Sequence, residues 1–375
     1  MSLRRSVLTL SILGLCACFA APVAAADGGT LGFVVREWYI ALHESKFMDE
    51  CPEGLTMGND EIWWRSAPKD FRAKVTDNGL ARSSIRYYEV MDRGKNGEDV
   101  CLNPTSIVDP PLRVVEGKIG YGHNIDGTQD GHATAKTCKH DKFQSPDGKK
   151  TDIDNQMARL VGCSFGWRKT GMIQLNGNEV RATSGYGMVL MEVTGVNEKD
   201  PRNSDNVTVT FYRSIDQFAM DSAGQPLPFS TYRIDTLDGK PRYSDSLKGK
   251  ITNGVLTTER GDVRLPAYDN FNFGHPTIKD MAVTLEIAAD GSAGKGMVSG
   301  YYDVEEFWYL TAGVGQVLQT GQFSCPAMYV AAHKLADGYP DPKTGECTHL
   351  SVGYNVKAYA AFVQHPDKER RQATR

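Results

Sequence analysis

From about residue 167 to residue 365, apolar and polar residues alternate along several short segments of the chain. The segments 207–211 and 283–287 show this pattern clearly, because an apolar residue occupies every second position. A period of two places alternate side chains on opposite faces of an extended chain, so both segments are predicted to be half-buried β-strands. The run 188–193 is almost continuously apolar, which is typical of a strand that lies deeper in a sheet.

Turn-forming residue pairs separate these predicted strands, and no regular helical pattern lies between them. The pairs are Asp238-Gly239, Asn253-Gly254, Gly261-Asp262 and Asp290-Gly291. Such pairs favour tight hairpin turns, and short strands joined in this way form antiparallel sheets. We therefore expect a mainly β protein, in which residues 167–365 form an antiparallel β-sandwich of the jelly-roll type.

The region before these strands is predicted to form a small, partly helical N-terminal lobe over residues 27–118. Apolar residues recur there at helical spacing, namely Leu31, Val34, Val35, Trp38, Ala41 and Leu42. Residues 119–166 are rich in Asp, Gly and His, and their end is predicted to form a short helix. A later helix is expected from Ala327 to Ala336, and the basic tail at 366–375 is expected to be disordered.

The first 26 residues have the organisation of an export signal. Arg4 and Arg5 precede an apolar run that is too short to span a bilayer, and alanines at 24–26 provide a cleavage site. An alternative interpretation makes Cys18 a lipidated N-terminus, because residues 15–18 look like a lipobox. No later stretch has the length of a transmembrane segment, so a periplasmic or extracellular location is expected.

Six cysteines follow the predicted signal: Cys51, Cys101, Cys138, Cys163, Cys325 and Cys347. An even number of cysteines in an oxidising compartment indicates disulfide bonds, although sequence alone allows many pairings. Proximity along the chain favours neighbours, which would give Cys51–Cys101, Cys138–Cys163 and Cys325–Cys347. No CxxC pair is present, so zinc ligation by cysteine is not expected.

The segment 124–131 alternates oxygen-bearing side chains with glycine, which lets a chain curl around an ion. It resembles the DxDGxxDG loops of thrombospondin type 3 and dockerin modules, and this resemblance implies calcium. Calcium prefers six to eight oxygen ligands. The candidates here are Asn124, Asp126, Asp130, Asp147, Asp152 and Asp154. Calcium would hold the loop rather than take part in chemistry. The alternative is that Asp, Asn and Gly serve only as turn formers.

Three histidines, His123, His132 and His140, lie in the same segment. Imidazole is the usual ligand of zinc or copper, so a transition-metal site is a second alternative. Their spacing matches no standard helix or strand face, and HxH and HExxH are absent. Solvated loop histidines are the simpler interpretation.

Catalytic motifs are sparse. GxSxG, the P-loop pattern and GxGxxG are all absent. The best catalytic candidates are Asp303 and Glu305, which would share one face of a strand as a carboxylate pair for glycoside hydrolysis. Aromatic residues that could stack on sugar rings are Trp63, Trp64, Tyr302 and Trp308.

The formal net charge of −4 would become −6 after removal of Arg4 and Arg5 with the signal. This mild acidic balance argues against a nucleic-acid partner, which requires a basic face. The chain as a whole resembles exported bacterial proteins that join a concanavalin-like or jelly-roll sandwich to Asp/Gly-rich loops. We expect an exported, calcium-stabilised binding module, with an extracellular carbohydrate as ligand, rather than an enzyme. The alternatives are a secreted polysaccharide hydrolase or lyase and a structural envelope protein without catalytic activity.

Overall fold

The computed structural model describes most of the chain after the predicted signal. The described residues are 28–56, 97, 99–108, 111–185, 187–269, 272–312 and 325–366. The predicted export signal with Cys18, the pair Trp63 and Trp64, and residues 367–375 of the predicted tail all lie outside the described residues.

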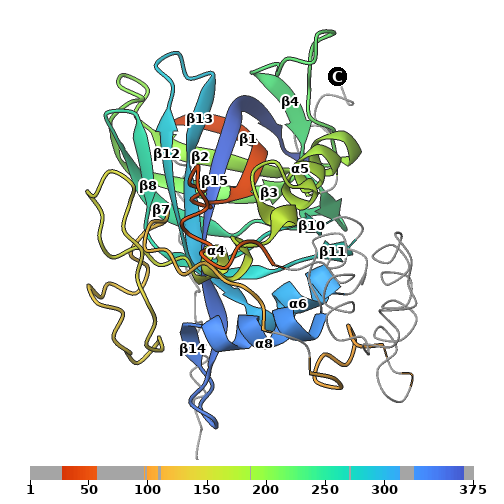
Figure 1. Ribbon diagram of the computed structural model, residues 1–375. Helices are drawn as coiled ribbons and strands as arrows, with labels where there is room; N and C mark the ends of the chain where they lie inside the picture. Colours follow the sequence, from red (N-terminus) through yellow and green to blue (C-terminus); the bar gives the residue numbers. More distant parts are fainter. Residues whose placement is uncertain are drawn as a thin grey trace, which may run out of the picture.

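Eight antiparallel strands close into a β-barrel (Figure 1). Around the barrel they run in the order β1 (Gly29–Ile40), β2 (Val189–Val196), β3 (Ser204–Arg213), β7 (Ser246–Thr252), β8 (Val255–Thr258), β12 (Thr277–Ile287), β13 (Ala293–Asp303) and β15 (Cys347–Gln364). β15 then pairs with β1, which closes the sheet on itself. The predicted open jelly-roll sandwich is therefore wrong. Alternating residues face a common core in a barrel and in a sandwich alike, so the sequence pattern does not distinguish them.

The side chains that point into the barrel fill it as one apolar core. The register brings apolar partners on neighbouring strands together, as in the pairs Phe33–Met191, Val193–Val209 and Leu256–Leu285. All of these side chains belong to a single buried cluster. The interior of an eight-stranded barrel is just wide enough for side chains to fill, and these buried side chains fill it here.

Residues 29–40 form β1, so the predicted partly helical N-terminal lobe is wrong for this part of the chain. Phe33 and Val35 belong to the interior core, whereas Val34 packs with Leu190 in a second cluster on the outside of the barrel. A strand covered on both faces carries apolar residues at consecutive positions. In β1 these positions also match helical spacing, which explains the error.

The helices lie outside the barrel wall. They are α4 (Gln156–Val161), α5 (Met172–Ser184), α6 (Val304–Ala312) and α8 (Cys325–Leu335), with the 3-10 helix η1 (Phe165–Trp167) between α4 and α5. The predicted helix at 327–336 corresponds to α8, and the short helix predicted near residue 157 corresponds to α4. None of the described helices combines the length and the apolar composition that a membrane crossing requires.

Short strands extend or flank the barrel. β4 (Ser230–Arg233) pairs in parallel with the end of β15, β9 (Gly261–Arg264) pairs with β12, and β14 (Gly338–Pro340) pairs with the start of β15. Two small hairpins consist of β5 (Thr236–Leu237) with β6 (Lys240–Pro241), and β10 (Ala267–Asp269) with β11 (Asn272–Gly274).

The segment 119–155 runs over the outer face of β13 and β15. Ser299 and Gly353 face outward side by side on these strands. The His123 imidazole contacts the Ser299 hydroxyl at 2.8 Å, and the Gly353 N–H donates to the side chain of Asn155 at 3.2 Å. These contacts hold a segment with few strand pairings of its own against the barrel wall.

Three disulfide bonds join the six cysteines, as predicted, but the predicted pairing of neighbours is wrong. The bonds are Cys51–Cys163, Cys101–Cys325 and Cys138–Cys347, with sequence separations of 112, 224 and 209 residues. Closure of the barrel brings distant parts of the chain together, so neighbours in space are not neighbours in sequence. Two of the bonds tie segments near residues 101 and 138 to α8 and β15.

Candidate functional site

The first candidate site arises where β1 extends beyond β2. Because β2 begins only at Val189, the backbone of Trp38 and Ile40 has no partner strand on that side among the described elements. Side chains of α5 take the place of a strand. Asn178 accepts a hydrogen bond from the Trp38 N–H at 2.7 Å, and Gln174 accepts one from the Ile40 N–H at 2.7 Å. The two residues lie four positions apart, so they share one face of the helix.

A cavity of about 140 Å³ lies between α5, η1, α6 and this end of the barrel. Its aromatic lining residues are Trp38, Trp167, Tyr302, Phe307 and Tyr354. An apolar protein cavity of roughly 150 Å³ is large enough to hold benzene. The space beneath α5 is therefore suited to a molecule of about that size.

Two features of the cavity wall point to an occupant. Trp167 is only 6% exposed, and its indole nitrogen has no hydrogen-bond partner among the described residues. A buried donor without an acceptor costs about 1–3 kcal/mol, and an acceptor on a bound molecule would remove that cost. Gly177 of α5 also lines the cavity, and a Cβ atom placed there would meet nothing within 4 Å in the described part of the chain.

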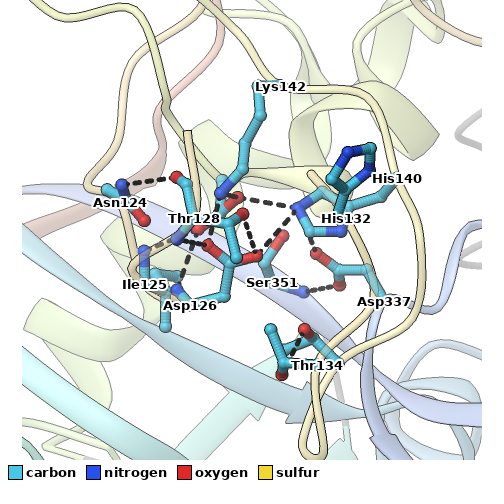
Figure 2. Close-up of polar contacts among 12 residues, drawn as sticks. Asn124, Ile125, Asp126, Thr128, His132, Thr134, His140, Lys142, Asp337 and Ser351 are labelled. Atoms are coloured by element: carbon cyan, nitrogen blue, oxygen red, sulfur yellow. Dashed lines mark hydrogen bonds and ion pairs between the residues drawn. The ribbon is translucent and has the colours of Figure 1, made fainter. Parts of the chain in front are cut away.

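The second candidate site is a cluster of five charged side chains beneath the segment 119–155 (Figure 2). Its members are Asp126, His140, Lys142, Asp154 and Asp337, and each side chain is at most 6% exposed. Lys142 Nζ lies 2.5 Å from Asp126 Oδ1 and 2.6 Å from Asp154 Oδ1. His140 Nε2 lies 2.8 Å from the same Asp154 oxygen. Figure 2 shows the lysine and the imidazole approaching the carboxylates from different directions.

Backbone groups fix the orientation of this cluster. Asp154 Oδ2 accepts hydrogen bonds from the N–H groups of Ile125 at 2.6 Å and Asp126 at 3.1 Å. Asp337 Oδ1 accepts from the Ser351 N–H at 2.6 Å. His140 Nδ1 lies 2.8 Å from the Cys138 carbonyl oxygen, and because a carbonyl only accepts, Nδ1 carries a proton.

Burial and charge shift the pKa values within the cluster. Burial raises the pKa of Asp337 to about 7, against the attraction of the nearby His140. Burial alone would lower the pKa of His140, but its hydrogen bond to Asp154 and the charge of Asp337 raise that pKa to about 9. The Asp337 atom Oδ2 has no hydrogen-bond partner among the described residues, and it lies 3.8 Å from His140 Nε2.

Of the six predicted calcium ligands, the structure brings Asp126 and Asp154 together. The other four lie outside the cluster: Asn124 and Asp152 are hydrogen-bonded to each other, and Asp130 and Asp147 are exposed on turns. Sequence reasoning missed Lys142 and Asp337. Nothing in the local pattern distinguishes Lys142, and Asp337 comes from the end of α8, far along the chain.

The two catalytic candidates do not face one another. Asp303 ends β13 and accepts a hydrogen bond from the Glu306 N–H at 2.9 Å, so it caps the start of α6. Glu305 lies in the first turn of α6, where it contacts Tyr329 at 2.9 Å and His333 at 3.0 Å. The expectation of a shared strand face is wrong, because the strand ends at Asp303.

The two predicted sugar-stacking residues within the described part of the chain are buried. Tyr302 and Trp308 are each 7% exposed. Tyr302 lines the cavity, whereas Trp308 packs edge-on against Tyr329 with ring centroids 5.1 Å apart. Neither ring presents a free face to the surface for a sugar.

Comparisons with protein-family models, with curated proteins and with solved structures gave no match.

Proposed function

We propose that this protein is an exported binding protein, whose barrel holds a small, mainly apolar molecule in the cavity beneath α5. The observation that carries the proposal is the buried N–H of Trp167, which has no hydrogen-bond partner among the described residues, in a cavity with five aromatic lining residues. The export signal predicted from the sequence and the three disulfide bonds support a location in an oxidising compartment.

The lining defines the chemistry of the ligand. Aromatic and aliphatic side chains together make up most of the wall, so the body of the ligand is apolar or aromatic. To pair with the Trp167 N–H, the ligand should carry one hydrogen-bond acceptor, such as a carbonyl or carboxylate oxygen. For so few non-hydrogen atoms, the dissociation constant is expected to be roughly micromolar to millimolar.

The polar lining supports binding rather than catalysis. Asn178 and Gln174 already hydrogen-bond the backbone of β1. The described lining residues include no carboxylate and no imidazole, and Arg181 is the charged residue among them. General acid–base chemistry needs a titratable pair within reach of the reacting group, and this lining does not supply one.

Gly177 allows a matched test of the proposal. Gly177→Leu would fill the cavity from the helix, whereas Gly177→Ala adds only one methyl group where space is open. Toluene, acetophenone and benzoate would be titrated against the full chain, with thermal unfolding and tryptophan fluorescence as readouts. We expect at least one of these compounds to stabilise the wild type and the alanine variant, and not the leucine variant. If no compound acts, or if the leucine variant responds equally, the cavity is not the binding site.

A second substitution tests the role of the indole N–H. Trp167→Phe keeps an aromatic wall and removes the donor. The variant should bind acetophenone roughly five-fold more weakly, which corresponds to about 1 kcal/mol, and should bind toluene no more weakly than the wild type. A glycan array is the parallel arm, because the sequence predicts a carbohydrate ligand. Glycan binding that is lost on substitution of Trp63 or Trp64 would favour that prediction over the cavity.

A further inference from the structure

The charged cluster beneath the segment 119–155 has an unbalanced set of charges. Its three carboxylates face one ammonium group, on Lys142, and one imidazole, on His140. With the three carboxylates ionised and both Lys142 and His140 protonated, the formal charge of the cluster is −1, and a divalent cation that displaces the His140 proton would bring it to zero. Uncompensated charge in a buried site is costly, so a single divalent cation would be the simplest complement.

One donor atom from each of His140, Asp126 and Asp154 lies within 4.8 Å of the others, and Asp337 approaches this trio on the His140 side. His140 Nε2 lies 2.8 Å from Asp154 Oδ1, 3.8 Å from Asp126 Oδ2 and 3.8 Å from Asp337 Oδ2. Four ligands at tetrahedral angles and about 2.0–2.1 Å from a zinc ion lie roughly 3.3 Å from one another. The separations from His140 lie on both sides of that value, so side-chain movements, the largest of them at Asp337 outside the trio, would complete the geometry.

One of these donors has no other hydrogen-bond role among the described residues. Asp337 is fully buried, and its Oδ2 atom points into the cluster without a hydrogen-bond partner. The hydroxyl of Tyr301, which is 2% exposed, likewise has no hydrogen-bond partner among the described residues. Burial and the negative charges of Asp337, Asp154 and Asp126 raise the pKa of this hydroxyl. Buried polar atoms are normally satisfied, and an ion at this position would satisfy Asp337.

In metal sites of proteins, the second nitrogen or oxygen of each ligating side chain is normally hydrogen-bonded, and the same contacts occur here. The Cys138 carbonyl accepts from His140 Nδ1, which leaves the lone pair of a neutral ring on Nε2. The other oxygens of the carboxylates accept backbone N–H groups, as in Asp154 from Ile125 and Asp337 from Ser351. We infer that His140, Asp126, Asp154 and Asp337 form a four-coordinate site for a zinc-type divalent cation.

Lys142 is compatible with this site. Its ammonium group contacts Asp126 Oδ1, whereas the imidazole faces Asp126 Oδ2. It shares only Asp154 Oδ1 with the proposed ion, and a carboxylate oxygen can accept two partners. The engaged second oxygens leave each carboxylate one donor atom, which suits four-coordinate zinc better than calcium with its six to eight ligands.

The test uses the full chain after treatment with EDTA. Zn²⁺ or Ca²⁺ would be added, and bound metal and melting temperature would be measured. We expect one equivalent of zinc to remain after gel filtration and to raise the melting temperature, with a smaller effect of calcium. Co²⁺ bound to the wild type should give the strong visible absorption of a four-coordinate ion. This measurement does not depend on whether any variant folds.

Matched variants assign the site. Asp337→Asn keeps the Ser351 contact and should weaken zinc binding at least about tenfold, whereas Asp130→Asn, on an exposed turn of the same segment, should have no effect. Asp126→Asn is the second variant if the first does not fold. An absence of zinc uptake, or a cobalt spectrum typical of six ligands, would overturn the inference. Calcium binding that depends on Asp130 would overturn it in favour of the calcium loop predicted from the sequence.

Discussion

The side chain of Asn178 completes the hydrogen-bond ladder of a strand although it lies in a helix. Its amide oxygen accepts from the Trp38 N–H at 2.7 Å, and its amide nitrogen donates to the Trp38 carbonyl at 3.1 Å. A β-strand partner makes the same pair of contacts. The Asn178 side chain therefore takes the place of a partner strand beyond the start of β2, and the backbone of Trp38 in β1 remains hydrogen-bonded there.

Replacement of Asn178 by alanine should therefore lower the free energy of unfolding. Asn178→Ala leaves an N–H and a carbonyl of the Trp38 backbone without this partner, and we expect a loss of about 2–4 kcal/mol in the free energy of unfolding. Asn176→Ala, at an exposed position of the same helix, should change it by less than about 0.5 kcal/mol. Urea denaturation measures both, and equal losses in the two variants would contradict the role assigned to Asn178.

Gly177 and Gly171 should respond to alanine in opposite directions. Gly177 lies in α5 beside space that no described residue fills, so alanine should stabilise the protein by about 1 kcal/mol through helix propensity. A Cβ atom at Gly171 would overlap the carbonyl oxygens of Phe165 and Gly166, and alanine should destabilise by more than about 1 kcal/mol. Thermal unfolding of the two variants checks the pair. A destabilised Gly177→Ala would show that the cavity is not open on that side.

Stability should fall in mild acid because of His123. Burial lowers the pKa of His123 from 6.5 to about 4, as the ring lies against Ser299 and Thr284. The unfolded chain therefore takes up a proton near pH 6.5 and the folded chain only near pH 4. The resulting stability is present above pH 6.5 and is lost as the pH falls towards 4.

The effect of His123 can be isolated with a neutral replacement. Between pH 7 and pH 4.5 the wild type should lose about 2 kcal/mol more than His123→Gln in the free energy of unfolding. His132→Gln, at an exposed imidazole of the same segment, should follow the wild type. A wild type and a His123→Gln variant with parallel pH profiles would mean that His123 does not titrate in this way.

The disulfide pattern predicts which peptides remain linked in the unreduced protein. Digestion and mass spectrometry should recover Cys51 with Cys163, Cys101 with Cys325 and Cys138 with Cys347. Replacement of both Cys101 and Cys325 by serine should cost about 2–5 kcal/mol. A recovered Cys51–Cys101 peptide would contradict the pairing.

Removal of the buried ammonium should destabilise the segment 119–155. Lys142→Met leaves Asp126 and Asp154 beside each other without their shared cation, and we expect a loss of about 3–5 kcal/mol. Lys149→Met removes an exposed lysine, 3.5 Å from Asp147, and should change stability by less than about 1 kcal/mol. Chemical denaturation in EDTA compares the two; similar losses would show that Lys142 makes no special contribution.

Local features of the fold could be predicted from the sequence. The alternating segments at 207–211 and 283–287 lie in β3 and β12, and Asn253-Gly254 forms the turn between β7 and β8. Both residues of that turn have positive φ, which Asn and Gly tolerate well. These features depend on a few consecutive residues, so a single sequence contains them.

The features that could not be predicted depend on distant residues. The pairing of β1 with β15 distinguishes a closed barrel from a sandwich, and no pattern of neighbouring residues in the sequence indicates this pairing. For the charged cluster, the Asp-rich loop indicated Asp126 and Asp154. Lys142 and Asp337 join them only because the loop and the end of α8 lie against the same strands. The cavity beneath α5 has the same origin, since Gly177 and Trp167 acquire their role through the end of the barrel.

The seam between β1 and β15 has a consequence for biogenesis. During synthesis from the N-terminus, β1 emerges hundreds of residues before the strand that covers its edge. Until then the nascent chain presents an unpaired apolar strand, which is the kind of edge that recruits a second molecule. A chaperone that shields β1 until β15 arrives would raise the yield of the folded protein, and stalled chains that end before β15 would be the species that aggregate.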